Sequence, residues 1–230
     1  MKDIKLVHLL TNPEENREKQ SVKDMLKLCN DLPNINYFQI VNKPFDEHPP
    51  TDNVIFGNSH WVAGKEKPYG SWGLTAGHYG CFKAHKDALL DFFYNSEYDY
   101  LIIAECDCKI HIDSKLFDSY IEEMIPLLEL DAYKLGTFVL PNHQSSFSNK
   151  ISTNIYETDL IVQTHMYMVT KKSKEFFIRI FDQYGWHCID WWFNLIFKKE
   201  NQYFLSFKDI VLTSQHAGQS QIDRHPTNIN

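Results

Sequence analysis

The chain has 230 residues, of which 43% are hydrophobic, and its formal net charge is −7. This length can bury one full core and no low-complexity linker divides it, so we expect a single domain over residues 1–230. The acidic balance argues against broad, charge-driven binding of nucleic acid. No apolar run is long enough for a membrane span or a signal peptide, and five cysteines do not suit a disulfide scaffold. We therefore expect a soluble, cytoplasmic protein.

The N-terminal part of the chain predicts strands that alternate with helices. Residues 4–10 predict a buried strand, and residues 16–32 place apolar side chains at helical spacing. Residues 35–41 predict a second strand and residues 53–56 a third. The segment 45–73 is rich in Pro, Gly, His and Trp and is long for an inert connection, so we expect a functional loop there.

The rest of the chain continues this alternation. We expect further helices at residues 80–96, 112–130, 172–185 and 189–199, strands at 98–110, 132–140, 160–170 and 203–207, and a polar loop at 143–154. Asp113 is a candidate N-cap, and Gly185 can end the helix before it. The pattern indicates an α/β fold with a mixed, mostly parallel central sheet flanked by helices.

The predicted strand at 98–110 ends in two carboxylates interleaved with two thiols, in the order Glu105, Cys106, Asp107, Cys108. Residues two apart in a strand share a face, so the carboxylates should point one way and the thiols the other. Ligands of open α/β sheets bind beyond the carboxyl ends of strands, where two converging carboxylates suit Mg²⁺ or Mn²⁺. The alternative is an ordinary solvated strand end.

A thiolate zinc site is a rival interpretation of the same segment. Such a site needs another Cys or His pair nearby. Cys29, Cys81 and Cys188 are isolated in sequence and lie in segments whose patterns bury them. We therefore favour the carboxylates as the chemically active groups.

Residues 74–110, LTAGHYGCFKAHKDALLDFFYNSEYDYLIIAECDCKI, resemble the lipooligosaccharide-type glycosyltransferases, nucleotide-sugar enzymes of the GT-A fold classed as family twenty-five. The pattern of that family runs L-T-x-G-E-x-G-C-x-x-S-H, followed by a helix and an apolar strand ending in E-D-D. The matching residues are Leu74, Thr75, Gly77, Gly80, Cys81, His85, Glu105 and Asp107. The departures are His78 for the acid, Ala84 for Ser and Cys106 for the central Asp.

Weaker similarities to these enzymes lie elsewhere in the chain. Residues 8–21 resemble their first strand and base-binding loop, and residues 164–177 the strand and helix before their second acidic site. Residues 211–223 are similar to their closing Q-x-x-x-S-x-I segment. The resemblance implies a Rossmann-related GT-A domain, with a nucleotide-sugar-binding half at 1–110 and an acceptor half at 111–230.

By this resemblance, the protein would be a metal-dependent hexosyl- or pentosyltransferase. It would move a sugar from a nucleotide-sugar, most simply a UDP-sugar, to a hydroxyl acceptor, with Mn²⁺ or Mg²⁺ as cofactor. Asp107 would ligate the metal, and Glu105 would assist by facing the ribose or the metal's waters. His216 is a candidate for a further ligand; the alternative is an exposed loop histidine.

The resemblance also implies a catalytic base and donor-binding residues. If the transfer inverts the anomeric centre, Asp190 is the candidate base; the alternative is an acid favoured by the helix N-terminal dipole. His85 would contact the donor phosphates, unless it is a buried, hydrogen-bonded core residue. Gly77 lies where backbone N–H groups can receive an anion, and Asn12 would contact the base or ribose.

Side chains next to the candidate base leave a further choice open. Trp191 and Trp192 could stack on a sugar ring, although aromatic residues at helical spacing more often belong to the core.

Two other functions remain open at this stage. A divalent-metal phosphohydrolase or nuclease would use Glu105 and Asp107, although it normally needs more clustered acids. A non-catalytic nucleotide- or sugar-binding protein on a degenerate GT-A scaffold is the other, because Cys106 replaces an acid. The acceptor is open among a glycan, a protein, a small molecule and, for a phage protein, modified nucleic acid.

Overall fold

The computed structural model describes residues 3–42, 60–62, 65–67, 76–138, 147–161, 164–207 and 212–215. Their main feature is an eight-stranded mixed sheet. Its strands, in spatial order, are β2 (Ile35–Val41), β1 (Ile4–Leu10), β5 (Tyr100–Glu105), β10 (Met166–Thr170), β7 (Leu135–Thr137), β11 (Phe204–Phe207), β9 (Ile155–Thr158) and β8 (Phe147–Lys150). The other described elements are the two-stranded pairs β6 (Cys108–Ile110) with β12 (Thr213–Gln215) and β3 (His60–Val62) with β4 (Lys65–Lys67), and the 3-10 turn η2 (Lys171–Ser173).

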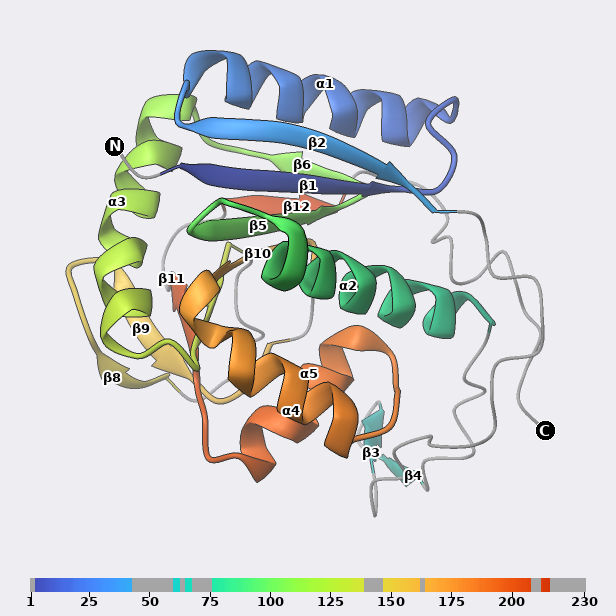
Figure 1. Cartoon of the computed structure of the whole chain (residues 1–230), viewed down its shortest axis with the longest axis vertical. Coiled ribbons are helices and arrows are strands. Elements are labelled where there is room, and N and C mark those ends of the chain that lie inside the picture. The colour runs from blue at the N-terminus through green and yellow to red at the C-terminus, as the bar shows by residue number, and fades with distance from the viewer. Residues whose placement is uncertain are drawn as a thin grey trace.

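Helices cover both faces of this sheet, as the sequence predicts for an α/β fold (Figure 1). They are α1 (Asn16–Asp31), α2 (Ala76–Asn95), α3 (Ser114–Leu130), α4 (Lys174–Gln183) and α5 (Ile189–Lys199). Strand β1 of the central sheet shows how the two faces are made. Its Leu6 packs into one buried cluster with α1 and α3, and its neighbour Val7 packs into the other with α2, α4 and α5. None of the described helices is long and apolar enough to cross a membrane.

The strand directions divide the sheet into two parts. Strand β1 pairs in parallel with β2 and β5, whereas β10 runs antiparallel to both β5 and β7. The sheet is mixed, as predicted, but it is not mostly parallel: among the described residues β1–β2, β1–β5 and β7–β11 are its parallel pairs, and its other four pairs are antiparallel. Antiparallel pairs can be joined by short connections, as between β8 and β9, which are consecutive in the chain and pair with each other.

Several predicted boundaries agree with the structure because the local signals are strong. Strands β1 and β2 and helix α5 have the predicted bounds. Helix α3 begins after Asp113, whose side chain accepts a hydrogen bond from the Leu116 backbone N–H, so the predicted N-cap is confirmed. Gly185 follows α4, although the residue that caps the helix is Tyr184.

One further prediction needs correction, and two others lie wholly or largely outside the described residues. The segment 143–154 is not only a loop, because it contains β8, an edge strand that pairs with β9 and has a polar sequence. The predicted strand at 53–56 lies outside the described residues, and the loop at 45–73 is described only at β3 and β4.

Candidate active site

The site is built where β5 ends, and it differs from the predicted strand end. Strand β5 stops at Glu105, Cys106 and Asp107 form a turn, and Cys108 starts β6, which pairs with β12 instead of joining the large sheet. Strand alternation therefore does not extend to Asp107, and that step of the sequence argument is wrong. The two carboxylates nevertheless approach a common histidine, because the turn brings Asp107 back toward the end of β5.

Glu105 extends the face of β5 that carries Leu101 and Ile103, and this face packs against α2. Its Oε1 accepts a hydrogen bond of 2.5 Å from the Thr164 hydroxyl and lies 3.3 Å from His85 Nε2. Its Oε2 accepts a hydrogen bond of 3.0 Å from His165 Nδ1. The two oxygens of one carboxylate thus serve two different sets of neighbours.

His165 is the site residue that the sequence analysis missed. It precedes β10, and its backbone C=O accepts a hydrogen bond from the Glu105 N–H because the antiparallel register places the start of β10 opposite the end of β5. Its Nδ1 also lies 3.8 Å from Asp107 Oδ1, and its Nε2 is buried without a hydrogen-bond partner in the described part of the chain. A pairing between residues 60 positions apart leaves no local sequence signal.

The pKa values of this pair are shifted in opposite directions. Burial alone would raise the pKa of Glu105, but the hydrogen bond and charge of His165, together with the nearby imidazole of His85, outweigh it and lower the pKa. Burial alone would lower the pKa of His165, and the hydrogen bond and charge of Glu105 outweigh it, so this pKa is raised. The pair therefore favours an ionised carboxylate beside a protonated imidazole.

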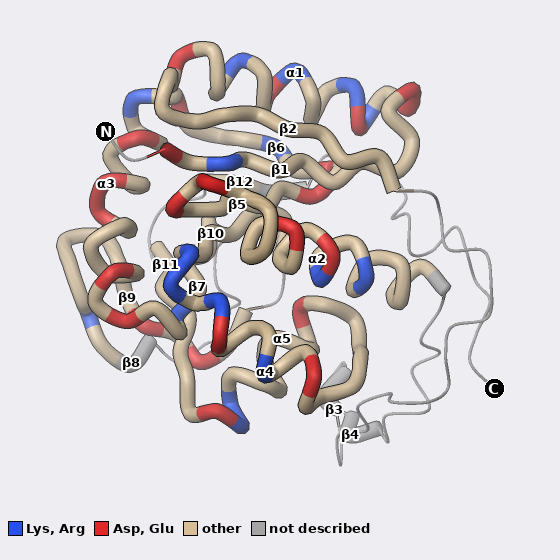
Figure 2. Tube along the Cα trace, in the orientation of Figure 1, with Lys and Arg blue, Asp and Glu red and all other residues tan. Residues whose placement is uncertain are grey.

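Asp107 faces the opposite helix layer. Its Oδ2 lies 3.4 Å from Arg17 Nη1, and both side chains are buried, with 7% and 3% of their surface exposed. Helix α1 carries charges of both signs along its length (Figure 2), yet Arg17 and Glu18 in its first turn are buried. Glu18 accepts hydrogen bonds from the backbone N–H groups of Thr11 and Asn12, which ties the loop after β1 to this turn.

A buried network of hydrogen bonds supports the turn formed by Cys106 and Asp107. A carbonyl oxygen only accepts, so His8 Nε2 carries the proton and donates to the Glu105 carbonyl at 3.2 Å, and the unprotonated Nδ1 accepts from the Tyr37 hydroxyl at 2.9 Å. Burial lowers the pKa of His8 to about 4, which keeps it neutral. The Ser21 hydroxyl donates to the Cys108 carbonyl at 2.7 Å. Both ends of the turn are thereby held by β1 and α1.

Two groups of possible metal-binding side chains meet at Glu105. Glu105, Asp107 and His165 form one, and Cys81, His85 and Glu105 form the other; within each, one ligand atom per residue lies within 4.8 Å of the others. Two carboxylates and one imidazole fit a divalent cation, and the imidazole favours Mn²⁺ over the harder Mg²⁺. Cys106 belongs to neither group.

Asp190 lies in the first turn of α5, close enough to the first group for its charge to interact with Glu105 and His165. Its Oδ1 accepts a hydrogen bond of 2.8 Å from the Trp191 N–H. Burial, with a smaller contribution from Glu105, raises its pKa to about 6. A carboxylate with this pKa can accept a proton near neutral pH. Trp192 is fully buried against Phe181, so of the two tryptophans only Trp191 is partly exposed.

The remaining predicted site residues are placed less specifically. Asn12 follows β1 with its side chain exposed, and Gly77 lies in the first turn of α2, partly exposed. His85 is fully buried, and its Nδ1 lies 3.0 Å from the Tyr167 hydroxyl, as the alternative of a buried, hydrogen-bonded histidine predicts. His216 lies outside the described residues. The donor contacts of Asn12, Gly77 and His85 and the metal role of His216 stay predictions.

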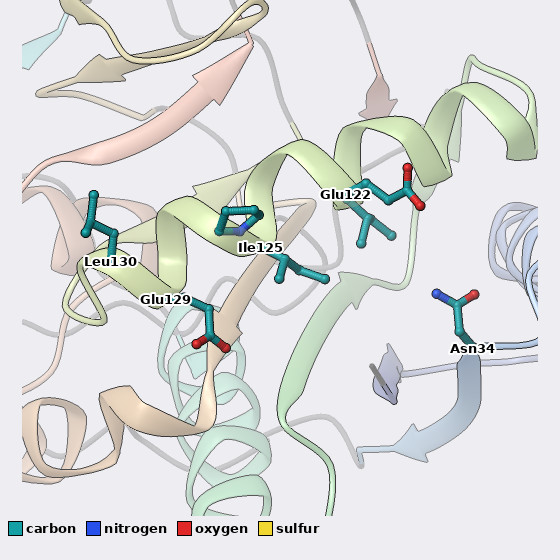
Figure 3. A pocket seen from close by; sticks show the side chains of 7 residues that line it. Asn34, Glu122, Ile125, Glu129 and Leu130 are labelled. Atoms are coloured by element: carbon teal, nitrogen blue, oxygen red, sulfur yellow. The ribbon is translucent and has the colours of Figure 1, made fainter. Parts of the chain in front are cut away.

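A pocket of about 750 Å³ lies elsewhere, between α3 and Asn34 (Figure 3). It is lined by Asn34, Ile121, Glu122, Ile125, Pro126, Glu129 and Leu130. Asn34 immediately precedes β2, so the pocket lies at the amino edge of the parallel strands. Since ligands of open α/β sheets bind at the carboxyl edge, this pocket is separate from the site at Glu105.

No family model and no curated protein matches the sequence. Solved structures do match the fold. A glycosyltransferase involved in the glycosylation of the major capsid of the virus PBCV-1 is 10% identical, with a TM-score of 0.55 over 96% of this chain and 96% of that chain. A mutant of Drosophila β-1,4-galactosyltransferase 7, in complex with manganese, UDP-Gal and xylobiose, is 9% identical, with a TM-score of 0.53 over 99% of this chain and 76% of that chain.

The chain has the GT-A glycosyltransferase fold. This confirms the fold that the resemblance implies. Membership of family twenty-five stays a prediction, because identities this low show the fold alone.

Proposed function

We propose that this protein is a metal-dependent glycosyltransferase that moves a sugar from a nucleotide-sugar, most simply a UDP-sugar, to a hydroxyl acceptor. The observation that carries this proposal is the group formed by Glu105, Asp107 and His165 at the carboxyl end of β5, in a chain with the GT-A fold. One of the similar structures is a galactosyltransferase in complex with manganese and UDP-Gal, which supports the choice of cation and donor.

The residues of the first group have separable tasks in this proposal. Asp107 and His165 would hold the cation, with Glu105 Oε2 beside them: the cation would displace the proton from His165 Nδ1, which lies 3.0 Å from Oε2 and 3.8 Å from Asp107 Oδ1. When bound, a divalent cation stabilises the negative charge that develops on the leaving diphosphate. Arg17 adds a buried positive charge on the other side of Asp107 and holds that carboxylate in place.

Asp190 is the proposed base for an inverting transfer. It is held at the start of α5 by its own hydrogen bond to the Trp191 N–H, and its raised pKa suits acceptance of a proton from the acceptor hydroxyl. The partly exposed Trp191 beside it offers a face on which a sugar ring can stack. Donor and acceptor would then meet between the end of β5 and the start of α5.

Thermal unfolding with nucleotide-sugars tests this proposal. We expect a UDP-sugar to raise the Tm in the presence of Mn²⁺ and to have little effect after EDTA treatment, because a ligand of the native state stabilises it. Asp107→Asn should abolish the increase. Asp99→Asn is the matched control, since Asp99 is exposed just before the opposite end of β5. The proposal is wrong if UDP-, GDP- and CDP-sugars all fail to give a Mn²⁺-dependent increase.

A further inference from the structure

The second group at Glu105 contains a thiol, that of Cys81, which the proposed transfer does not use. Cys81 and His85 are four residues apart on α2, so they lie on one face of the helix, and this face meets the end of β5. The sulfur, the imidazole nitrogen and a Glu105 oxygen lie within 4.8 Å of one another. A thiol, an imidazole and a carboxylate are ligands that zinc accepts, whereas manganese and magnesium avoid thiolates.

His85 supplies an independent indication that a ligand belongs here. Its side chain is fully buried, and its Nε2 makes no hydrogen bond within the described residues, although Glu105 Oε1 lies 3.3 Å away. Its other nitrogen lies 3.0 Å from the Tyr167 hydroxyl, and the two rings are stacked 5.6 Å apart. An imidazole fixed through one nitrogen, with the other facing a carboxylate without a hydrogen bond, has the arrangement of a metal-ligating histidine.

We propose that Cys81, His85 and Glu105 form a binding site for Zn²⁺. Zinc bonds of about 2.3 Å to sulfur and about 2.0–2.2 Å to nitrogen and oxygen place tetrahedral ligand atoms roughly 3.4–3.6 Å apart. The 3.3 Å separation of His85 Nε2 from Glu105 Oε1 is already close to that value. Three protein ligands leave a fourth position for water or another ligand.

The thiol of Cys81 gives the site a pH dependence. A cysteine binds zinc as the thiolate, so the thiol must lose its proton when the cation binds. A bound cation replaces this proton, which passes to solvent. One proton is therefore released from the thiol for each cation bound, and the affinity increases with pH.

The site is distinct from the proposed manganese group although both include Glu105. The oxygen near His85 is Oε1, which also accepts the Thr164 hydrogen bond, whereas the oxygen near His165 is Oε2. A cation bound at Oε1 leaves Oε2, the Glu105 oxygen on the side of His165 and Asp107, free to serve the manganese group. Removing the Cys81 thiol should therefore spare Mn²⁺-dependent donor binding, and removing the Asp107 charge should spare the zinc site.

Cobalt is the probe that reports the thiolate directly. Metal-free, reduced full-length protein is titrated with Co²⁺, which occupies zinc sites and gives a near-ultraviolet thiolate-to-metal charge-transfer band together with visible bands of a tetrahedral ion. We expect one equivalent of Co²⁺ to produce both and Zn²⁺ to reverse them. Cys81→Ser should abolish the charge-transfer band, and His85→Gln should weaken binding by about 10-fold or more.

The controls separate this site from other thiols and from the proposed function. Cys29→Ser is the matched control, since Cys29 is half-buried on α1 and lies in neither group; this variant should keep the band. Asp107→Asn should keep the band while losing the UDP-sugar response. Absence of a band in the wild-type protein, or its persistence in Cys81→Ser, would overturn the zinc site. A band without a UDP-sugar response would reject only the transferase proposal.

Discussion

Glu105 and Asp107 are two residues apart, yet they face helices on opposite sides of the sheet. Glu105 meets α2 and is surrounded by two imidazoles and a hydroxyl, whereas Asp107 meets α1 and a buried guanidinium. The turn at Cys106 and Asp107 produces this difference, because an unbroken strand would have kept both carboxylates on the α2 side.

Because of this difference, we expect replacement of the two carboxylates to have different effects. Glu105 accepts hydrogen bonds from the Thr164 hydroxyl and from His165 Nδ1, and thereby positions His165. Asp107 has its charge balanced by Arg17 at a longer 3.4 Å, which suits a group that also ligates a cation. Replacing Asp107 should therefore affect the reaction most, and replacing Glu105 should affect the stability of the site.

Asp107→Asn should have the largest effect. The loss of a cation ligand removes the stabilisation of the leaving diphosphate, which is worth several kcal/mol, so transfer should fall by about 10³-fold or more. Sugar transfer to an accepted hydroxyl substrate, measured as release of the nucleoside diphosphate at saturating Mn²⁺, checks this. A variant with near wild-type rates would remove Asp107 from the metal site.

Asp190→Asn should have the next largest effect and a different signature. Transfer should fall by at least about 10²-fold with donor binding retained, because only the proton acceptor is lost. In the wild type, transfer should decrease as the pH falls below about 6, where Asp190 becomes protonated. Measurement of kcat against pH, together with the UDP-sugar Tm response of the variant, tests both points.

The stability of the Asp190 variant provides its control. When folding raises the pKa of a carboxylate, the folded protein becomes less stable as the pH rises from the unfolded pKa to the folded pKa. For Asp190 these pKa values are about 3.9 and about 6. The variant lacks this cost and should be more stable than the wild type above pH 6, by up to about 3 kcal/mol. Lost transfer in a variant that is less stable at pH 8 would contradict the assignment.

Glu105→Gln should chiefly lower stability, by about 1–3 kcal/mol, because its buried hydrogen-bond donors lose an anionic partner. The contribution of Glu105 to the free energy of unfolding is present above its unfolded pKa of about 4.3 and is lost at lower pH. That of His165 is present below about pH 6.5 and is lost as the pH rises through its raised pKa. Urea unfolding should therefore show the largest difference from the wild type near pH 5–6, and a difference independent of pH would contradict the pairing.

Ser21→Ala should have the smallest effect, a destabilisation of about 1 kcal/mol, because the Cys108 carbonyl loses its hydrogen bond below the turn. Ser119→Ala is the matched control, since the Ser119 hydroxyl makes a similar bond to the Leu116 carbonyl on the exposed side of α3. Urea unfolding should show little change in the control. Equal effects of the two substitutions would show that the turn is not held by this network.

The sequence predicted elements whose signals are local. The bounds of β1, β2 and α5 follow from runs of apolar residues and from helical periodicity, and the N-cap at Asp113 follows from its residue type. The polar strand β8 was missed because an edge strand needs little apolar sequence. Its place in the fold is set by pairing with β9.

The candidate site was predicted only in part, because some of its residues, like β8, are placed by pairing with other segments. Glu105 and Asp107 were chosen from their place after an apolar run, but the turn between them carries no clear local signal. His165 and Cys81 are brought to Glu105 by strand pairing and helix packing between distant segments. Cys81 is isolated along the sequence, but in the folded chain its sulfur lies within 4.8 Å of ligand atoms of His85 and Glu105.

A crystal structure with Mn²⁺ and UDP tests the central claim most directly. An anomalous difference map from data above and below the manganese absorption edge locates the ion independently of the atomic coordinates. We predict one manganese peak between Asp107 and His165, beside Glu105 Oε2, in contact with the diphosphate. A manganese ion bound to UDP away from these side chains, or UDP bound without a manganese peak, would contradict the account.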